Sequence, residues 1–88
     1  MKKLTQEESF RSQTLKEIRK ALTKNEVSFL TTSKIFDTRR RKIAKTYFVF
    51  NRSILEVSGK FQITYTRVSQ ILHRMLEIME RELAKRSY

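Results

Sequence analysis

Apolar residues recur along this chain at spacings of three and four, the period of an amphipathic helix. The first apolar face comprises Phe10, Leu15, Ile18 and Leu22. Residues 5–8 read Thr-Gln-Glu-Glu, which has the Thr-x-x-Glu form of a capping box. These two signals predict a first helix from Gln6 to about Leu22.

The segment from Asn25 to Phe36 has a weaker pattern. Its apolar residues suit a helix or a short strand, and three consecutive hydroxyl side chains at 31–33 favour a break. We expect a short helix from Glu26. Asp37 is a good N-cap for the next helix, and Asn51 is a plausible left-handed end for it. The apolar face of that helix comprises Ile43, Ala44, Tyr47, Phe48 and Phe50.

Residues 53–74 have the pattern of a helix-turn-helix. Ser53 to Glu56 forms a second capping box and begins a helix that ends near Phe61, and Thr64 is placed to cap the following helix. The small Ser58 lies where the two helices must approach closely. The apolar pattern then continues without a stop signal, which predicts a long C-terminal helix with an apolar face of Val68, Ile71, Leu72, Met75, Ile78, Met79 and Leu83.

Composition supports one small helical domain. The 88 residues include no proline and a single glycine, Gly59, so helix breakers are rare. We therefore expect an all-α fold over residues 1–88: a small helical bundle with a helix-turn-helix and a long C-terminal helix.

The charge balance indicates a polyanion as partner. Lys and Arg number 20 against nine acidic residues, for a formal net charge of +11. Glutamates follow the first lysines where a signal peptide would need an apolar run, and no stretch approaches the roughly 20 apolar residues of a membrane span. We expect a cytoplasmic protein without a membrane partner.

The polar face of the second motif helix is suited to reading double-stranded DNA. The N-terminal part of such a helix enters the major groove, where Gln70 is able to pair with adenine and an arginine with guanine. The expected base contacts are Tyr65, Thr66, Arg67, Ser69, Gln70 and His73. Phosphates are expected at a cationic run beginning with three arginines and at the recognition helix, through Arg39, Arg40, Arg41, Lys42, Lys45, Thr64 and Arg74.

Other chemistry is weakly indicated. The sequence has no cysteine, one histidine, no glycine-rich phosphate loop and no nucleophile motif, so we expect no enzyme, metal or cofactor. The aromatic residues Tyr47, Phe48 and Phe50 are able to stack on single-stranded bases, although their helical spacing favours a place in the core.

The C-terminal helix is apolar over more than one stripe. Such a surplus either closes a small core or meets a partner helix, and a disulfide-free chain of this size benefits from oligomerisation. We expect a homodimer whose interface includes Met75, Ile78, Met79 and Leu83, with help from the first helix.

The residues from Thr64 to Arg74, with Val68, Ser69, Gln70 and His73 between them, resemble the helix-turn-helix of the KorA (TrfB-type) repressors of conjugative plasmids. This resemblance implies a dimer that binds an inverted-repeat operator and represses transcription, with Gln70 and the residues around Thr64 as base readers. The chain departs from the family pattern at three places. Tyr65 stands where the family usually has arginine, Gln62 replaces a turn glycine, and residues 24–42 resemble an insertion.

Two further interpretations remain open. The motif is also similar to region 4 of bacterial sigma factors, which implies promoter recognition in contact with RNA polymerase. The third interpretation is a protein that binds nucleic acid through charge alone, without sequence preference.

Overall fold

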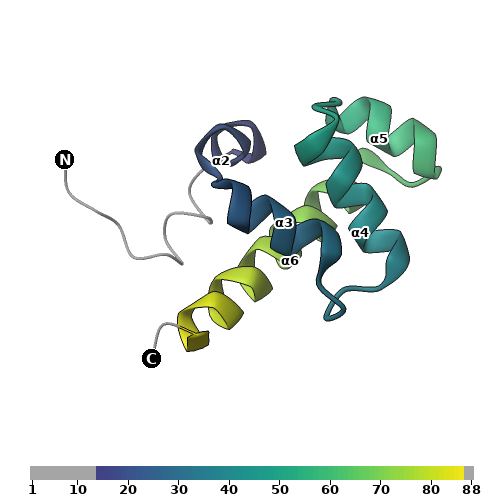
Figure 1. Cartoon of the computed structure of the whole chain (residues 1–88). Coiled ribbons are helices and arrows are strands. Elements are labelled where there is room, and N and C mark those ends of the chain that lie inside the picture. The colour runs from purple at the N-terminus through teal and green to yellow at the C-terminus, as the bar shows by residue number, and fades with distance from the viewer. Residues whose placement is uncertain (1–13, 87–88) are drawn as a thin grey trace.

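The structure, a computed structural model, describes residues 14–86. This part of the chain is a small helical bundle without strands and with a long C-terminal helix, as expected for an all-α fold (Figure 1). Its elements are α2 (Leu15–Ala21), α3 (Lys24–Thr32), α4 (Thr38–Ala44), the π-helix η1 (Lys45–Val49), α5 (Ile54–Phe61) and α6 (Tyr65–Arg86).

The start of the first helix differs from the prediction. Thr14 has an extended backbone and forms a reciprocal capping box with Glu17, so α2 begins at Leu15 and a helix running unbroken from Gln6 is wrong. The sequence contains two Thr-x-x-Glu signals, at Thr5 and Thr14, and the second of them forms a cap. The first signal, at Thr5, lies outside the described residues.

The weakly patterned segment is a helix, as expected. Thr23 caps α3 through a reciprocal pair with Glu26, which puts the helix start two residues before the expected one. Hydroxyls of Thr31 and Thr32 donate to carbonyls of the preceding turn, a competing hydrogen bond that weakens helix continuation. The helix ends at Thr32, with Ser33 as its extended C-cap, which confirms the expected break.

The helix after Asp37 changes its period near its end. Asp37 caps α4 as expected, and α4 continues directly into η1, where the Phe50 N–H donates to the carbonyl of Lys45. A π turn is wider than an α turn, so the residues after it are rotated away from the α-helical register. Tyr47 and Phe48 are buried as expected, whereas Phe50 is 56% exposed, so its expected place in the core is wrong.

Helix α6 is the centre of the bundle. It contacts α2, α3, α4 and α5, and Figure 1 shows it passing beneath α3 toward the C-terminus. Its 22 residues confirm the expected long C-terminal helix. Its buried face comprises Val68, Ile71, Leu72, Met75, Leu76 and Met79.

Candidate nucleic-acid interface

The turn between α5 and α6 has a tight, well-bonded geometry. Gln62 adopts a left-handed conformation (φ 56°, ψ 45°), and the Ile63 N–H donates to the carbonyl of Ser58 over 3.2 Å. The Ser58 hydroxyl donates in turn to the carbonyl of Ile63. These bonds set the entry into α6, and Thr64 then caps that helix by accepting from the Arg67 N–H at 3.1 Å.

The first turns of α6 present a polar face directed away from the core. Thr66, Arg67, Gln70 and Arg74 are exposed, while Val68, Ile71 and Leu72 on the opposite face are buried. Arg74 lies 3.6 Å from the Glu77 carboxylate, which neutralises part of its charge. Within residues 14–86 the Gln70 amide has no hydrogen-bond partner, so both its donor and its acceptor are available to a ligand.

Three other expected base readers lie on the flank of α6 that faces α2. Tyr65, Ser69 and His73 follow one another at intervals of four residues and line a groove of about 510 Å³. The His73 ring bonds through Nδ1 to the carbonyl of Ser69 over 3.0 Å. Because a carbonyl only accepts, Nδ1 is the donor in this contact.

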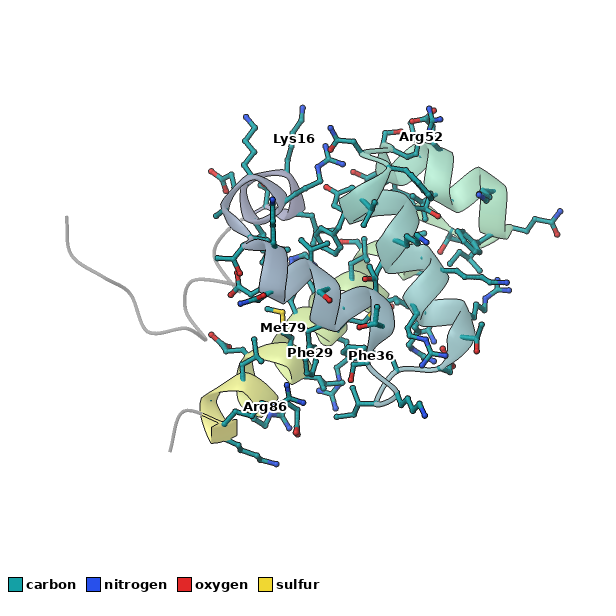
Figure 2. The ribbon with its side chains drawn as sticks, in the orientation of Figure 1. Lys16, Phe29, Phe36, Arg52, Met79 and Arg86 are labelled. Atoms are coloured by element: carbon teal, nitrogen blue, oxygen red, sulfur yellow. The ribbon has the colours of Figure 1, made fainter. Side chains whose placement is uncertain are left out.

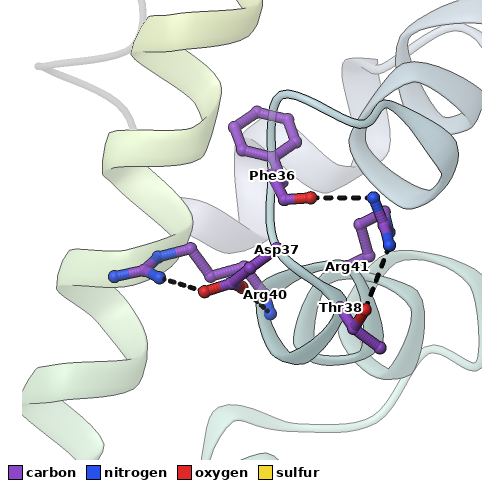
Figure 3. A network of polar contacts seen from close by, with 5 residues as sticks. All are labelled: Phe36, Asp37, Thr38, Arg40 and Arg41. Atoms are coloured by element: carbon purple, nitrogen blue, oxygen red, sulfur yellow. Dashed lines mark hydrogen bonds and ion pairs between the residues drawn. The ribbon is translucent and has the colours of Figure 1, made fainter.

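The expected cationic run at residues 39–41 is occupied by contacts inside the protein. Arg39 donates to the carbonyl of Phe61 at 2.7 Å and lies over the ring of the same residue. Arg41 donates to the carbonyls of Ser33 and Phe36 and to the hydroxyl of Thr38. Figure 3 shows the contacts of Arg41 with Phe36 and Thr38 beside the pair of Arg40 with Asp37.

Asp37 is the anionic member of this cluster. Its carboxylate accepts from the Arg40 backbone N–H at 2.8 Å and pairs with the Arg40 guanidinium at 2.7 Å. The backbone hydrogen bond, with the charge of Arg40, lowers the pKa of Asp37 below its ordinary value. The three arginines therefore also have partners inside the protein, and their expected phosphate contacts stay a prediction. Of the expected phosphate contacts in α4 and η1, the exposed side chains are Arg39, Lys42 and Lys45, and Arg40 and Arg41 are partly buried.

Two of the residues expected at the dimer interface are buried inside the single chain, which corrects that expectation. Met75 and Met79 are each 1% exposed in the single chain, so they are core residues and offer no surface to a second copy. Ile78 and Leu83 are partly buried and pack against the same core. The additional apolar residues of this helix contact several neighbouring helices. The spacing of apolar residues in a sequence does not distinguish such contacts from a dimer interface.

Sequence reasoning missed the contribution of α2 to this surface. Lys16 and Arg19 line the groove beside the recognition helix, together with Tyr47 and Leu55. The sequence signal was limited to two cations on the outer side of a predicted helix. That α2 lies against the start of α6 depends on packing between segments about fifty residues apart.

No family model matches this chain, and no curated protein or solved structure shows significant similarity to it. Across residues 14–86 no helix has the length and hydropathy to span a membrane. In the same part of the chain, no group of three or more His, Asp or Glu side chains is arranged to hold a metal ion.

Proposed function

We propose that this protein is a sequence-specific, double-stranded DNA-binding regulator of transcription. The observation that carries the proposal is the exposed face of Thr66, Arg67, Gln70 and Arg74 on a helix whose opposite face is buried. A helix entering the major groove needs this division, because one face must be anchored while the other offers donors and acceptors to base edges. The net charge of +11 supplies attraction to the phosphate backbone.

Gln70 is the main base reader in this proposal. It lies in the second turn of α6, and its side-chain amide matches the donor and acceptor edge of adenine. Arg67 and Arg74 flank it and address guanine or phosphate. Lys42 and Lys45 contact phosphates from α4 and η1, beside the exposed Arg39.

The operator in this proposal is an inverted repeat bound by two copies of the chain. One short recognition helix reads few base pairs, and a two-fold pair doubles the site. The resemblance to the KorA repressors suggests repression, in the cytoplasm, as the outcome of binding. The interface between the copies lies outside Met75 and Met79.

Gln70→Ala tests the base-reading role. We expect the affinity for the preferred site to fall by about 1–3 kcal/mol, with little change for random-sequence DNA. Asn25→Ala is a matched control, because it also removes an exposed amide from a helix but lies on α3. Equal losses by Gln70→Ala on preferred and random duplexes would contradict the assignment.

A further inference from the structure

The groove beside the recognition helix is built from four elements, α2, η1, α5 and α6. Lys16 and Arg19 come from α2, Ser53 and Leu55 from the start of α5, and Tyr65, Ser69 and His73 from α6. Its floor includes Leu15, Tyr47 and Ile54. Figure 2 shows Lys16 and Arg52 extending from one end of the molecule, with Arg86 at the other end.

Tyr47 brings an unpartnered hydroxyl to this groove. The residue is 3% exposed, and its hydroxyl forms no hydrogen bond with any residue from 14 to 86. The groove is the surface that Tyr47 lines, and the hydroxyl is therefore available to a molecule bound there.

The Tyr47 hydroxyl is suited to donating a hydrogen bond. Burial raises the pKa of Tyr47, a rise that the nearby Arg19 guanidinium opposes and Tyr65 increases. With a raised pKa the group keeps its proton at neutral pH. A neutral O–H that has lost most of its water contacts favours a strong acceptor, and phosphate oxygens are the strongest acceptors that DNA offers.

The charged side chains that line the groove are the cations Lys16 and Arg19, and the carboxylates of Glu17 and Glu56 are bound at its edge to Thr14 and Ser53. Arg19 lies over the Tyr47 ring, 4.3 Å from its centre, and donates to the carbonyls of Tyr47 and Arg52. These contacts fix a positive charge at the groove. Lys16 is exposed at the rim, and the lining includes no acidic side chain.

We propose that this groove holds a phosphate of the DNA backbone, on the strand that borders the α2 side of the recognition helix. The inference rests on the proposed function and adds a contact site to it. Lys16 supplies a mobile positive charge, Tyr47 and Tyr65 donate O–H groups, and Arg19 supplies a fixed charge. The groove lies along the flank of α6 that carries Tyr65, Ser69 and His73. When α6 enters the major groove of DNA, the DNA backbone therefore lies next to this position.

Two substitutions test the site on a random-sequence DNA duplex, which needs no knowledge of the operator. Lys16→Gln should flatten the slope of log K against log salt by roughly 0.9, the value for one lost phosphate contact. Tyr47→Phe should weaken binding about tenfold at fixed salt, with an unchanged slope, because it removes a neutral donor. Both variants should keep the wild-type melting temperature, since neither side chain loses an internal hydrogen bond.

Lys85→Gln is the matched control. It removes the same charge from the far end of α6, roughly 30 Å along the helix from Tyr65, and should leave the slope unchanged. The inference is overturned if Lys16→Gln and Lys85→Gln change the slope equally, or if Tyr47→Phe binds as tightly as the wild type. A wild-type protein that does not bind the duplex at low salt would instead refute the proposed function.

A titration with inorganic phosphate separates the two sources of this ligand chemistry. With DNA as the source, we expect no saturable shift of the Tyr47 ring resonances when phosphate is added at constant ionic strength. Saturable binding of phosphate that both substitutions abolish, combined with unaltered DNA binding, would overturn the DNA assignment in favour of a small phosphorylated ligand.

Discussion

Two residues of this chain occupy a backbone region that favours glycine. Asn51 and Gln62 have φ values of 62° and 56°, and each follows the end of a helical segment. Asparagine tolerates this left-handed conformation because its short polar side chain bonds locally, whereas glutamine is strained there. Gln62 lies in the turn that orients the recognition helix, so the backbone strain is in that turn.

Gln62→Gly should therefore stabilise the protein. We expect a gain of about 0.5–1 kcal/mol, since relief of roughly 1–2 kcal/mol of left-handed strain is partly offset by the backbone entropy of glycine. Chemical denaturation measures the change. Asn51→Gly is the control and should gain less; no gain from Gln62→Gly would mean that the Gln62 backbone is not strained.

The carboxylate of Asp37 predicts a pH dependence of stability. Its pKa is lowered in the folded protein, first by the hydrogen bond from the Arg40 backbone. The stabilisation is therefore fully present above the ordinary pKa of 3.8 and is lost as the pH falls through the lowered value.

Asp37→Asn keeps a capping side chain but removes this titration. We expect the stability advantage of the wild type over the variant to be constant near neutral pH and to shrink below about pH 4. Urea unfolding across that range measures it. A constant advantage down to pH 2 would show that the charge of Asp37 does not contribute.

At the scale of elements, local chemistry made several helix limits predictable. The caps at Asp37, Ser53 and Thr64, and the left-handed Asn51, were all read correctly because each depends on residues within one turn. The start of α2 was not, because the sequence has the Thr-x-x-Glu form at Thr5 as well as at Thr14. The π turn at Lys45–Val49 was not predictable either, since it depends on how Tyr47 and Phe48 pack against other helices.

The cationic side chains of helix α4 have two roles: some bond to groups inside the protein, and others are exposed to solvent. Arg41 bridges the Ser33 and Phe36 carbonyls to α4, whereas Lys42 is exposed beside it. Arg41→Ala should cost about 1–3 kcal/mol of stability, because these carbonyls lose a charged donor. Lys42→Ala should leave stability nearly unchanged and weaken DNA binding.

Thermal unfolding and a DNA titration of both variants measure this contrast. The assignment fails if Arg41→Ala is as stable as Lys42→Ala, or if Lys42→Ala binds random-sequence DNA with the wild-type salt dependence.

At the scale of the molecule, tertiary packing limited what the sequence predicts. The polar face of Thr66, Gln70 and Arg74 was predictable, because it follows from the period of one helix. The groove was not, because Lys16, Tyr47 and Leu55 meet through the packing of α2, η1 and α5 around α6. For the same reason Met75 and Met79 were mistaken for interface residues.

A symmetric operator predicts a definite stoichiometry. Two copies should bind one palindromic duplex, with recognition helices about 34 Å apart, and a single half-site should bind one copy more weakly. Sedimentation of the complexes measures the ratio. One copy on a full palindrome at saturating protein would remove the dimer from the proposal.

The most direct test of the central claim is the selection of binding sites from random double-stranded DNA by the wild-type protein. The account predicts enrichment of an inverted repeat whose half-sites are centred about 10 base pairs apart, and loss of that enrichment with Gln70→Ala. Tight binding of the pool without enrichment of any sequence would contradict it and leave a protein that binds nucleic acid through charge alone.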